Sequence, residues 1–235
     1  MARQIESAGR VPLSRDRVLG SAVALADGAG IDSVSMRKLA QELGVVPMAL
    51  YKHVANKEEL LGGMVDVIVG EMDLPRPSAD WRAGVRQRIL SARRVLLRHP
   101  WASRVIESRS TPTPVVLEYM DSMIGMFRAG GFSVDLTHHV MHALGNRVFG
   151  FTQELFDGSA GEGDDPQERT AMLAQMSGRY PYVVEIASGA AHDGQSLVGP
   201  GCDDQFEFEF ALDLLLDGFE RLRLQGWSSP GQRQS

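Results

Sequence analysis

Side chains that donate hydrogen bonds to phosphates and base edges gather in one short stretch near the start of the chain. All three lysines, Lys38, Lys52 and Lys57, fall within a window of twenty residues, and Tyr51 and His53 lie among them. The first 60 residues carry eight basic and seven acidic side chains, whereas the remainder carries 16 basic and 23 acidic ones. A polyanion would therefore be repelled by most of the chain and accepted at this end.

Signals that start helices are unusually complete around these donors. Ser14, Ser35 and Asn56 can each accept a hydrogen bond from the first turn of a helix, and Pro47 suits the first position of another. Glu59 follows Asn56 by three residues and completes a capping box. Helix starts this close together require short helices that pack tightly against one another.

The segment from residue 36 to 54 has the features of a helix-turn-helix. Such a motif needs a small residue where its helices touch and a tight turn between them, which Ala40 and Gly44 supply. The alternative is a helical hairpin with a solvated basic face, which the lysine cluster and the repeated start signals disfavour. The inner apolar face is expected to consist of Leu39, Leu43, Val45, Leu50 and Val54.

This segment resembles the DNA-binding domain of the tetracycline-repressor (TetR) family, over a match from about Leu13 to Val69. The string SMRKLAQELGV, followed closely by ALYKHVANKEELL, carries the resemblance. The resemblance implies that Arg37 hydrogen-bonds a guanine, consistent with the bidentate fork of an arginine. It also implies that Tyr51 and His53 contact the DNA backbone or bases, and that Lys57 contacts a phosphate.

Two positions depart from the tetracycline-responsive members of that family, in which they are polar. Pro47 and Ala49 offer no side-chain donor there, so the operator sequence is expected to differ. Met48 and Ala49 are expected to contact thymine methyl groups instead. The full set of expected DNA-contacting residues is Ser35, Arg37, Lys38, Pro47, Met48, Ala49, Tyr51, Lys52, His53 and Lys57.

The rest of the chain is predicted to be helical with breaks, since no segment shows the period-two alternation of a strand. Helices are expected over 81–98, 100–107, 115–129, 134–156, 166–187 and 204–224. The fold class is therefore all-α, with a three-helix helix-turn-helix domain followed by a larger helical ligand-binding and dimerisation domain. The predicted divisions are a disordered tail at 1–12, the DNA-binding domain with its connecting helix at 13–72, the sensing domain at 73–225 and a tail at 226–235.

The last predicted helix carries apolar residues on nearly every face around 210–216. A helix that is apolar all round must be buried on all sides. Burial in the core of one chain is one explanation, whereas the resemblance implies a four-helix dimer interface shared with the helix after Ser133. Two-fold symmetry also suits a palindromic operator. Interface candidates are Leu136, Val140, Phe151, Leu155, Phe210, Leu214 and Leu215.

Methionine and aromatic residues of the second domain form a soft apolar set that suits varied small molecules. Plain core packing is the alternative for any one of them. His138 and His142 are one helical turn apart, but no nearby carboxylate or cysteine completes a tetrahedral metal site, so neither a metal nor a cofactor is expected. Candidate effector contacts are Met120, Met123, Met126, Phe127, His142, Met172, Met176 and Tyr180.

An enzyme is the main competing class, and the motifs disfavour it. The chain has no phosphate loop, dinucleotide fingerprint, nucleophile elbow or paired zinc-ligand motif, and Cys202 has no basic neighbour to activate it. A single cysteine, a start without an apolar signal and no run long enough to span a membrane predict a soluble, cytoplasmic protein.

The sequence therefore predicts a ligand-responsive transcriptional regulator that is not an enzyme. Its expected partners are double-stranded operator DNA, a second copy of itself and an unidentified small hydrophobic effector that releases a palindromic operator. A DNA-binding protein without an inducer, or a transcriptional activator, is the alternative.

Overall fold

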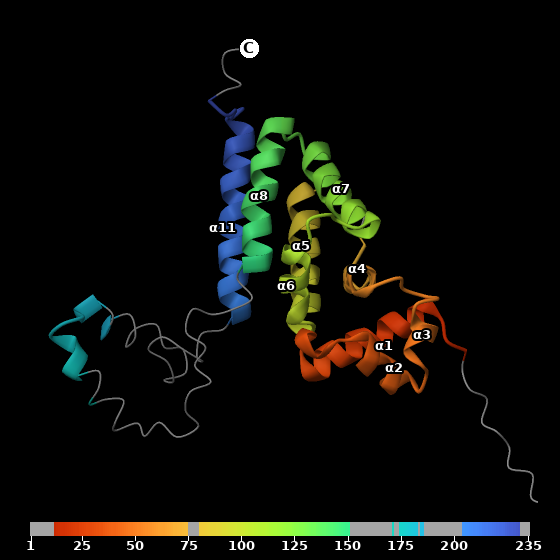
Figure 1. Ribbon diagram of the computed structural model, residues 1–235. Coiled ribbons are helices and arrows are strands. Elements are labelled where there is room, and N and C mark those ends of the chain that lie inside the picture. The colour runs from red at the N-terminus through yellow and green to blue at the C-terminus, as the bar shows by residue number, and fades with distance from the viewer. Residues whose placement is uncertain are drawn as a thin grey trace, which may run out of the picture. The chain divides into compact units, whose positions relative to one another are not determined.

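The computed structural model describes residues 12–74, 80–150, 171, 174–182, 184–185 and 204–230. Within these residues every regular element is a helix, as predicted, and the helices group into two compact units, with the division in the chain between Gly130 and Gly131. The predicted division at residue 72 between a DNA-binding and a sensing domain stays a prediction, because the two units are defined by contacts between residues and not by function. The elements, labelled as in Figure 1, are α1 (Arg15–Ala29), η1 (Ile31–Ser33), α2 (Met36–Leu43), α3 (Pro47–Leu50), α4 (Lys57–Gly70), α5 (Trp81–Arg98), α6 (Trp101–Ser108), α7 (Pro114–Ala129), α8 (Val134–Gly150) and α11 (Asp204–Leu224).

The first unit begins with α1, α2 and α3, whose apolar faces meet in one small core. Val18 of α1, Leu39 of α2 and Leu50 of α3 have no exposed surface. The predicted inner face is confirmed at Leu39, Leu43, Leu50 and Val54, which are buried, whereas Val45 is half-buried.

Side-chain caps fix where these helices begin. Ser14 and Ser35 each accept the backbone N–H three residues ahead at 3.2 Å, as predicted. Asn56 Oδ1 accepts the Glu59 N–H at 2.8 Å, and the Glu59 carboxylate accepts the Ala55 N–H at 2.7 Å. The predicted capping box is therefore present, but its return bond reaches the residue before the cap instead of the cap itself.

The third helix is shorter than its sequence indicates. α3 ends at Leu50, and residues 51–53 form a turn closed by the His53 N–H on the Leu50 carbonyl at 2.8 Å. Val46 precedes the helix and has no side-chain oxygen to cap it. Tyr51, Lys52 and His53 therefore lie in the turn after α3, not on the helix itself.

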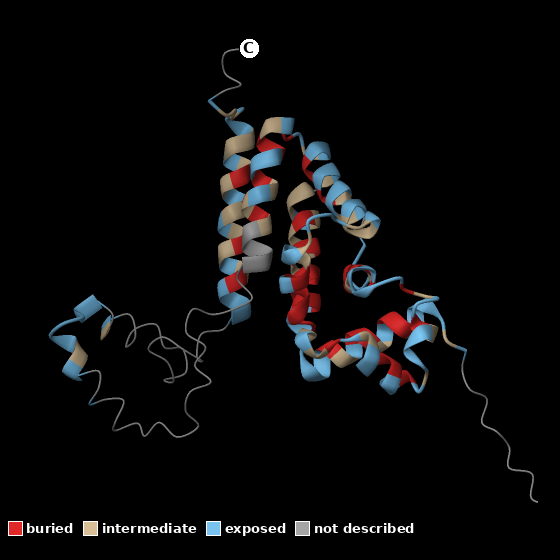
Figure 2. Ribbon diagram, viewed as in Figure 1, coloured by how far each residue is buried: buried red, intermediate tan, exposed pale blue. Residues whose placement is uncertain are grey.

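Helices α4 to α7 complete the first unit. α5 spans the predicted range, and Asp80 caps it by accepting the Arg82 N–H at 2.9 Å. α4 contacts α1, α5, α6 and α7, so it connects α1 to the other helices of this unit. Figure 2 shows buried residues along α5 and along the inner sides of α1 and α2, where this unit has its core.

In the second unit α8 and α11 lie side by side (Figure 1). Ser133 caps α8 by accepting the Leu136 N–H at 3.0 Å, and α11 has the predicted bounds. The helix expected over 166–187 is interrupted by a turn before Pro181, within the residues described there. The predicted end of α8 near residue 156 lies outside the described residues, as do Phe151, Leu155 and Met172. The same holds for the N-terminal tail predicted to be disordered, apart from residue 12, and for the predicted C-terminal tail beyond residue 230.

Candidate nucleic-acid interface and effector region

The turn between α2 and α3 sets the direction in which α3 leaves α2. Gly44 has a φ of 65°, in the left-handed region that favours glycine. The Val45 N–H donates to the Ala40 carbonyl at 2.9 Å, and the Gly44 N–H reaches the Gln41 carbonyl at 3.2 Å. These bonds close the end of α2 as a Schellman-type motif, so the two short helices are held in a helix-turn-helix.

The start of α2 presents positive charge. Ser35, Arg37 and Lys38 are all exposed, and the Ser35 hydroxyl is engaged in capping the helix. The N-terminus of a helix carries a partial positive charge that adds to that of the two cations. This end of α2 therefore suits a phosphate or an electron-rich base edge.

The α3 segment exposes a mixed face of apolar and donor groups. Pro47, Met48, Tyr51 and Lys52 are exposed, with 71% of the Met48 surface accessible. Two further residues of the predicted set, Ala49 and His53, are half-buried and contribute less surface.

Val46 is an exposed residue of this face that the predicted set omitted. It is 68% exposed, although valine usually lies inside. Val46 stands directly before Pro47 and has the extended backbone that a following proline favours, with φ −77° and ψ 144°. The position of Val46 directly before Pro47 is the sequence signal that would have identified it.

Lys57 occupies the first position of α4 and is exposed. The helix is capped by Asn56, which accepts the Glu59 N–H, and its N-terminal end carries a partial positive charge beside the lysine. This is the geometry of a phosphate-contacting helix start.

A polar cluster joins α1 to the start of α6. Asp27 Oδ1 accepts the Trp101 indole N–H at 2.6 Å and lies 2.8 Å from His99 Nδ1. His99 Nε2 is 3.4 Å from Glu71, just past the end of α4. His99 and Trp101 are both buried, so three helices of the first unit share one network.

A second connection joins the end of α6 to α4. Arg109 donates to the Glu58 carbonyl at 3.1 Å. Its guanidinium lies so close to Gly62 that a Cβ there would be 3.1 Å from Nη2. Displacement of α6 would therefore be transmitted to the helix that begins at Lys57.

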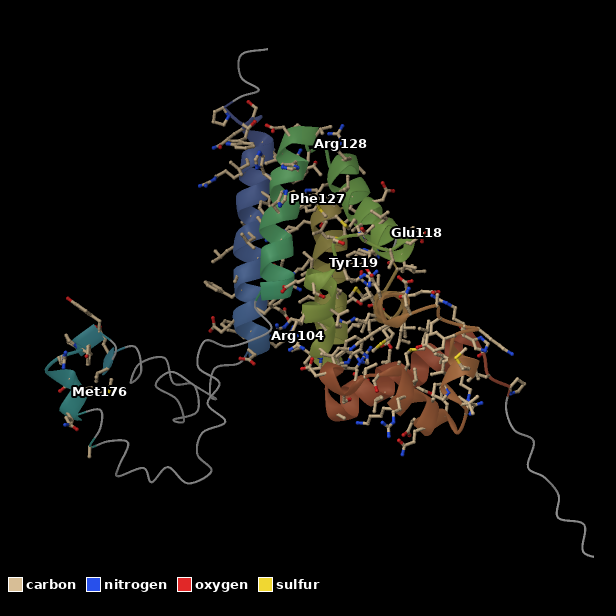
Figure 3. All side chains as sticks on the ribbon, in the orientation of Figure 1. Arg104, Glu118, Tyr119, Phe127, Arg128 and Met176 are labelled. Atoms are coloured by element: carbon tan, nitrogen blue, oxygen red, sulfur yellow. The ribbon has the colours of Figure 1, made fainter. Side chains whose placement is uncertain are left out.

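The predicted effector residues of α7 differ in burial. Met123 and Phe127 are buried, Met126 is half-buried and Met120 is 42% exposed. The Phe127 ring lies 5.6 Å from that of Trp81 on α5. Figure 3 shows Tyr119 and Phe127 on the side of α7 nearest α5, with Glu118 on its outward side.

Arg88 of α5 is a functional candidate that the sequence reasoning missed. It lies on the buried side of α5 with Val85 and Ile89, and is itself buried. Its guanidinium stacks over the Tyr119 ring at 4.2 Å from the centroid. An arginine within an apolar stripe of helical spacing was the available signal.

Three described residues of the predicted effector set belong to the second unit, and among them the Tyr180 backbone N–H donates to the Met176 carbonyl at 2.8 Å. His142 and Tyr180 are exposed, and Met176 is half-buried. The rings of His138 and His142 are 4.6 Å apart in an edge-to-face arrangement. Among the described residues, no group of three or more His, Cys, Asp or Glu could hold a metal ion.

The predicted interface residues of the second unit also divide by burial. Leu136 and Val140 are buried inside the unit, Leu215 is half-buried, and Phe210 and Leu214 are more than half exposed. Phe206, which the prediction omitted, is 55% exposed and stacks on Phe210 with 6.4 Å between centroids. These exposed residues recur every four positions, so they form one apolar stripe on α11.

Comparison with known proteins places the fold and this exposed face in context. A family model described as "Bacterial regulatory proteins, tetR family" matches residues 18–64, and one described as "Tetracyclin repressor-like, C-terminal domain" matches residues 74–223. The transcriptional repressor DrrR1 of Streptomyces coeruleorubidus is 30% identical over 231 residues, which cover 93% of this chain and 82% of DrrR1.

The chain also resembles solved structures over most of its length. Apo ActR of Streptomyces coelicolor is 26% identical with a TM-score of 0.73, over 92% of this chain and 99% of ActR. ActR has also been solved with actinorhodin. BioQ of Mycobacterium smegmatis, solved with its DNA operator, is 26% identical with a TM-score of 0.58, over 88% of this chain and 98% of BioQ.

The fold and the exposed α2–α3 face define a helix-turn-helix regulator of transcription that binds DNA and responds to a ligand. The match of both family models shows that the chain belongs to the TetR family. Within the part of the chain that the structure describes, no helix has the length and apolar character to cross a membrane.

Proposed function

We propose that the chain is a homodimeric repressor that binds a palindromic operator and releases it when a small hydrophobic molecule binds. The observation that carries this proposal is the exposure of Arg37, Lys38 and Lys52 on a frame of capped helices. The operator complex of BioQ supports the binding of an operator, and the actinorhodin complex of ActR supports the binding of a small molecule. The protein acts by binding and catalyses no reaction. It acts in the cytoplasm, where it reaches the operator DNA.

The DNA contacts are assigned by position and chemistry. Arg37 reads a guanine through its fork, whereas Lys38, Lys52 and Lys57 hold phosphates. Met48 and the half-buried Ala49 touch thymine methyl groups, and Val46 extends that apolar contact. The remaining contacts of the proposed interface come from Ser35, Pro47, Tyr51 and His53.

Dimerisation uses the apolar stripe of α11. Phe206, Phe210 and Leu214 expose more than half of their surface each. Exposed apolar stripes of this kind mark protein–protein contacts. A two-fold pairing of α11 with its copy buries the stripe, and α8 completes a four-helix seam whose inner layer includes Leu136 and Val140.

The effector acts through α6. A ligand shifts the protein only by binding its DNA-fitting and non-fitting states with different affinity. A ligand beside Met123 and Phe127 displaces α6, and the Asp27 and Arg109 connections transmit that displacement to α1 and α4. The spacing of the two recognition segments in the dimer then changes.

Selection of bound sequences from a random pool of duplex DNA tests this function. The expected product is a palindrome whose half-site centres lie about 34–36 Å apart along the helix axis. Failure to enrich any sequence over bulk DNA, or enrichment of single half-sites only, would contradict the proposal. Effector action is then measured as release of the selected duplex in a gel shift.

A further inference from the structure

Arg88 is a buried cation with no carboxylate partner among the described residues. It is 5% exposed, and its Nη1 donates to the main-chain carbonyl of Asp73 at 2.9 Å. The Asp73 carboxylate does not serve, since it accepts from Arg94 at 2.8 Å. The Arg88 Nε is buried and has no hydrogen-bond partner.

A buried charge is costly unless an opposite charge and hydrogen bonds compensate it. Burial lowers the pKa of the Arg88 guanidinium, with the adjacent Tyr119 opposing this, yet an arginine pKa starts so high that the group stays charged. Burial is also the main cause that raises the pKa of the Tyr119 phenol. Tyr119 is therefore neutral at pH 7 and supplies a ring face, not a negative charge.

The unfilled part of this guanidinium is the part that recognises carboxylates. Nε and Nη2 together form the edge with which arginine binds a carboxylate bidentately. Nη1, on the other edge, is already used by Asp73. An acceptor with two oxygens would satisfy the free Nε and neutralise the charge at once.

The surroundings of Arg88 along α7 are apolar. Met123 and Phe127 follow Tyr119 at intervals of four residues on the same side of the helix, and both are buried. Trp81 of α5 adds a ring beside Phe127. Methionine side chains readily repack around a ligand. The cation thus lies at one end of an apolar strip shared by α5 and α7.

On the basis of the proposed function, we propose that the effector is an apolar molecule with a carboxylate, and that Arg88 binds the carboxylate while the strip from Tyr119 to Phe127 takes the apolar body. The competing explanation is structural: Arg88 would only hold the Asp73 carbonyl and so tie the end of α4 to α5. That role predicts no preference for acidic ligands.

The test uses aromatic and straight-chain acids paired with their own primary amides: 2-naphthoic acid and 2-naphthamide, 4-biphenylcarboxylic acid and its amide, and decanoic acid and decanamide. Thermal stabilisation of the full-length protein ranks them, and calorimetric titration gives affinities. In at least one pair we expect the acid to bind about 10- to 100-fold more tightly than the amide, the range of a hydrogen bond to a charged group. Amides that equal their acids throughout, or a set in which no acid binds, would overturn the proposal.

Two variants locate the effect. Arg88→Met should bring each acid to within about twofold of its amide, and Arg88→Lys, which keeps the charge but loses the fork, should retain part of the preference. Arg94→Gln removes an exposed cation from the same helix and should leave the preference intact. A preference that survives in both Arg88 variants, or that Arg94→Gln abolishes, would also overturn the assignment. If Arg88→Met does not fold, Arg88→Lys and the wild-type pairs decide.

Release of selected operator DNA separates this inference from the function on which it rests. An acid that binds through Arg88 but leaves the operator complex intact would refute its role as effector and keep the anion site. Absence of any sequence-specific DNA complex would refute the proposed function, while the acid and amide affinities would still be measured.

Discussion

Two exposed faces, one on each unit, differ in what they require from a partner. The α2–α3 face exposes cations and apolar groups on the capped helix α2 and the segment around α3, whereas α11 exposes a stripe of two phenylalanines and a leucine. The first is well solvated alone and gains by neutralising phosphates. The second leaves large apolar surface in water and gains only by covering it with another apolar surface. Exposure alone thus does not define an interface, and the chemistry of the exposed atoms does.

The largest effect is expected from a charge in the α11 stripe. Leu214→Asp would leave an unpaired carboxylate in the seam, so the variant should sediment as a monomer. Because a dimer holds two half-sites at once, operator affinity should fall about 100- to 10,000-fold. Leu214 is exposed in the single chain, so helicity should be preserved.

Leu214→Met is the matched control for that change. It keeps an apolar side chain at the same place, and both the dimer and operator affinity should persist. A Leu214→Asp protein that remains dimeric would show that the stripe serves a different purpose.

The second effect concerns the α2–α3 face. Arg37→Ala should cost about 1–3 kcal/mol of operator binding and relax the preference at one base pair per half-site. Lys57→Ala should weaken all sequences alike and reduce the slope of log affinity against log salt by about one per protomer. Unchanged base preference in a repeated selection with Arg37→Ala would remove that residue from base reading.

The third effect concerns the packing of α1 against α4, the helices that support this face. A Cβ at Gly63 of α4 would lie 2.6 Å from Leu19 Cδ2, and Leu19 is buried in α1. Gly63→Ala should therefore lower the free energy of unfolding by about 1–3 kcal/mol in urea titrations. Gly20→Ala, on the exposed side of α1 with nothing within 4 Å, should raise it by up to about 1 kcal/mol. Equal changes in the two variants would mean that α1 and α4 do not meet this closely.

The smallest effect is a pH dependence confined to the second unit. Hydrogen bonding from the Ser229 backbone N–H at 2.6 Å is the main cause that lowers the pKa of Asp135. A carboxyl with a lowered pKa stabilises the fold above its unfolded pKa, and this contribution is lost as pH falls through the folded pKa. Protection of the Ser229 amide from hydrogen exchange should therefore decrease in acid. Asp135→Asn should remove that decrease, and operator contacts of the first unit should show none of it.

Local signals in the sequence were sufficient for most of the fold. Ser14, Ser35, Asn56, Asp80 and Ser133 each cap a helix with a bond to a residue two or three positions ahead, so the information lies within one turn of sequence. α3 was the exception, because Val46 cannot cap and Pro47 starts a helix without specifying its length. The need to begin α4 at Lys57 limits how far α3 can extend beyond Leu50. This limit is a tertiary constraint.

The sequence was a poorer guide to those parts of the site that depend on contacts between residues far apart in the chain. The donors near Lys52 could be recognised because exposed polar residues remain once the apolar face is assigned. The sequence showed Arg88 within an apolar stripe but not its pairing with Tyr119, 31 positions away, because that pairing exists only after α5 and α7 meet. Leu136 and Val140 show the same limit: their apolar character predicted burial but not whether their own α11 or a second chain provides it.

The hydrogen bond from Trp101 to Asp27 also makes the protein its own optical probe. Indole emission shifts in wavelength and intensity when its N–H partner and its solvent exposure change, and Trp101 is buried at the junction of α1 and α6. Trp81 beside Phe127 reports independently on the strip that ends at Arg88. With Trp227 replaced by phenylalanine, the two remaining indoles would follow ligand entry and the response of the DNA-reading end in one cuvette, without any attached dye.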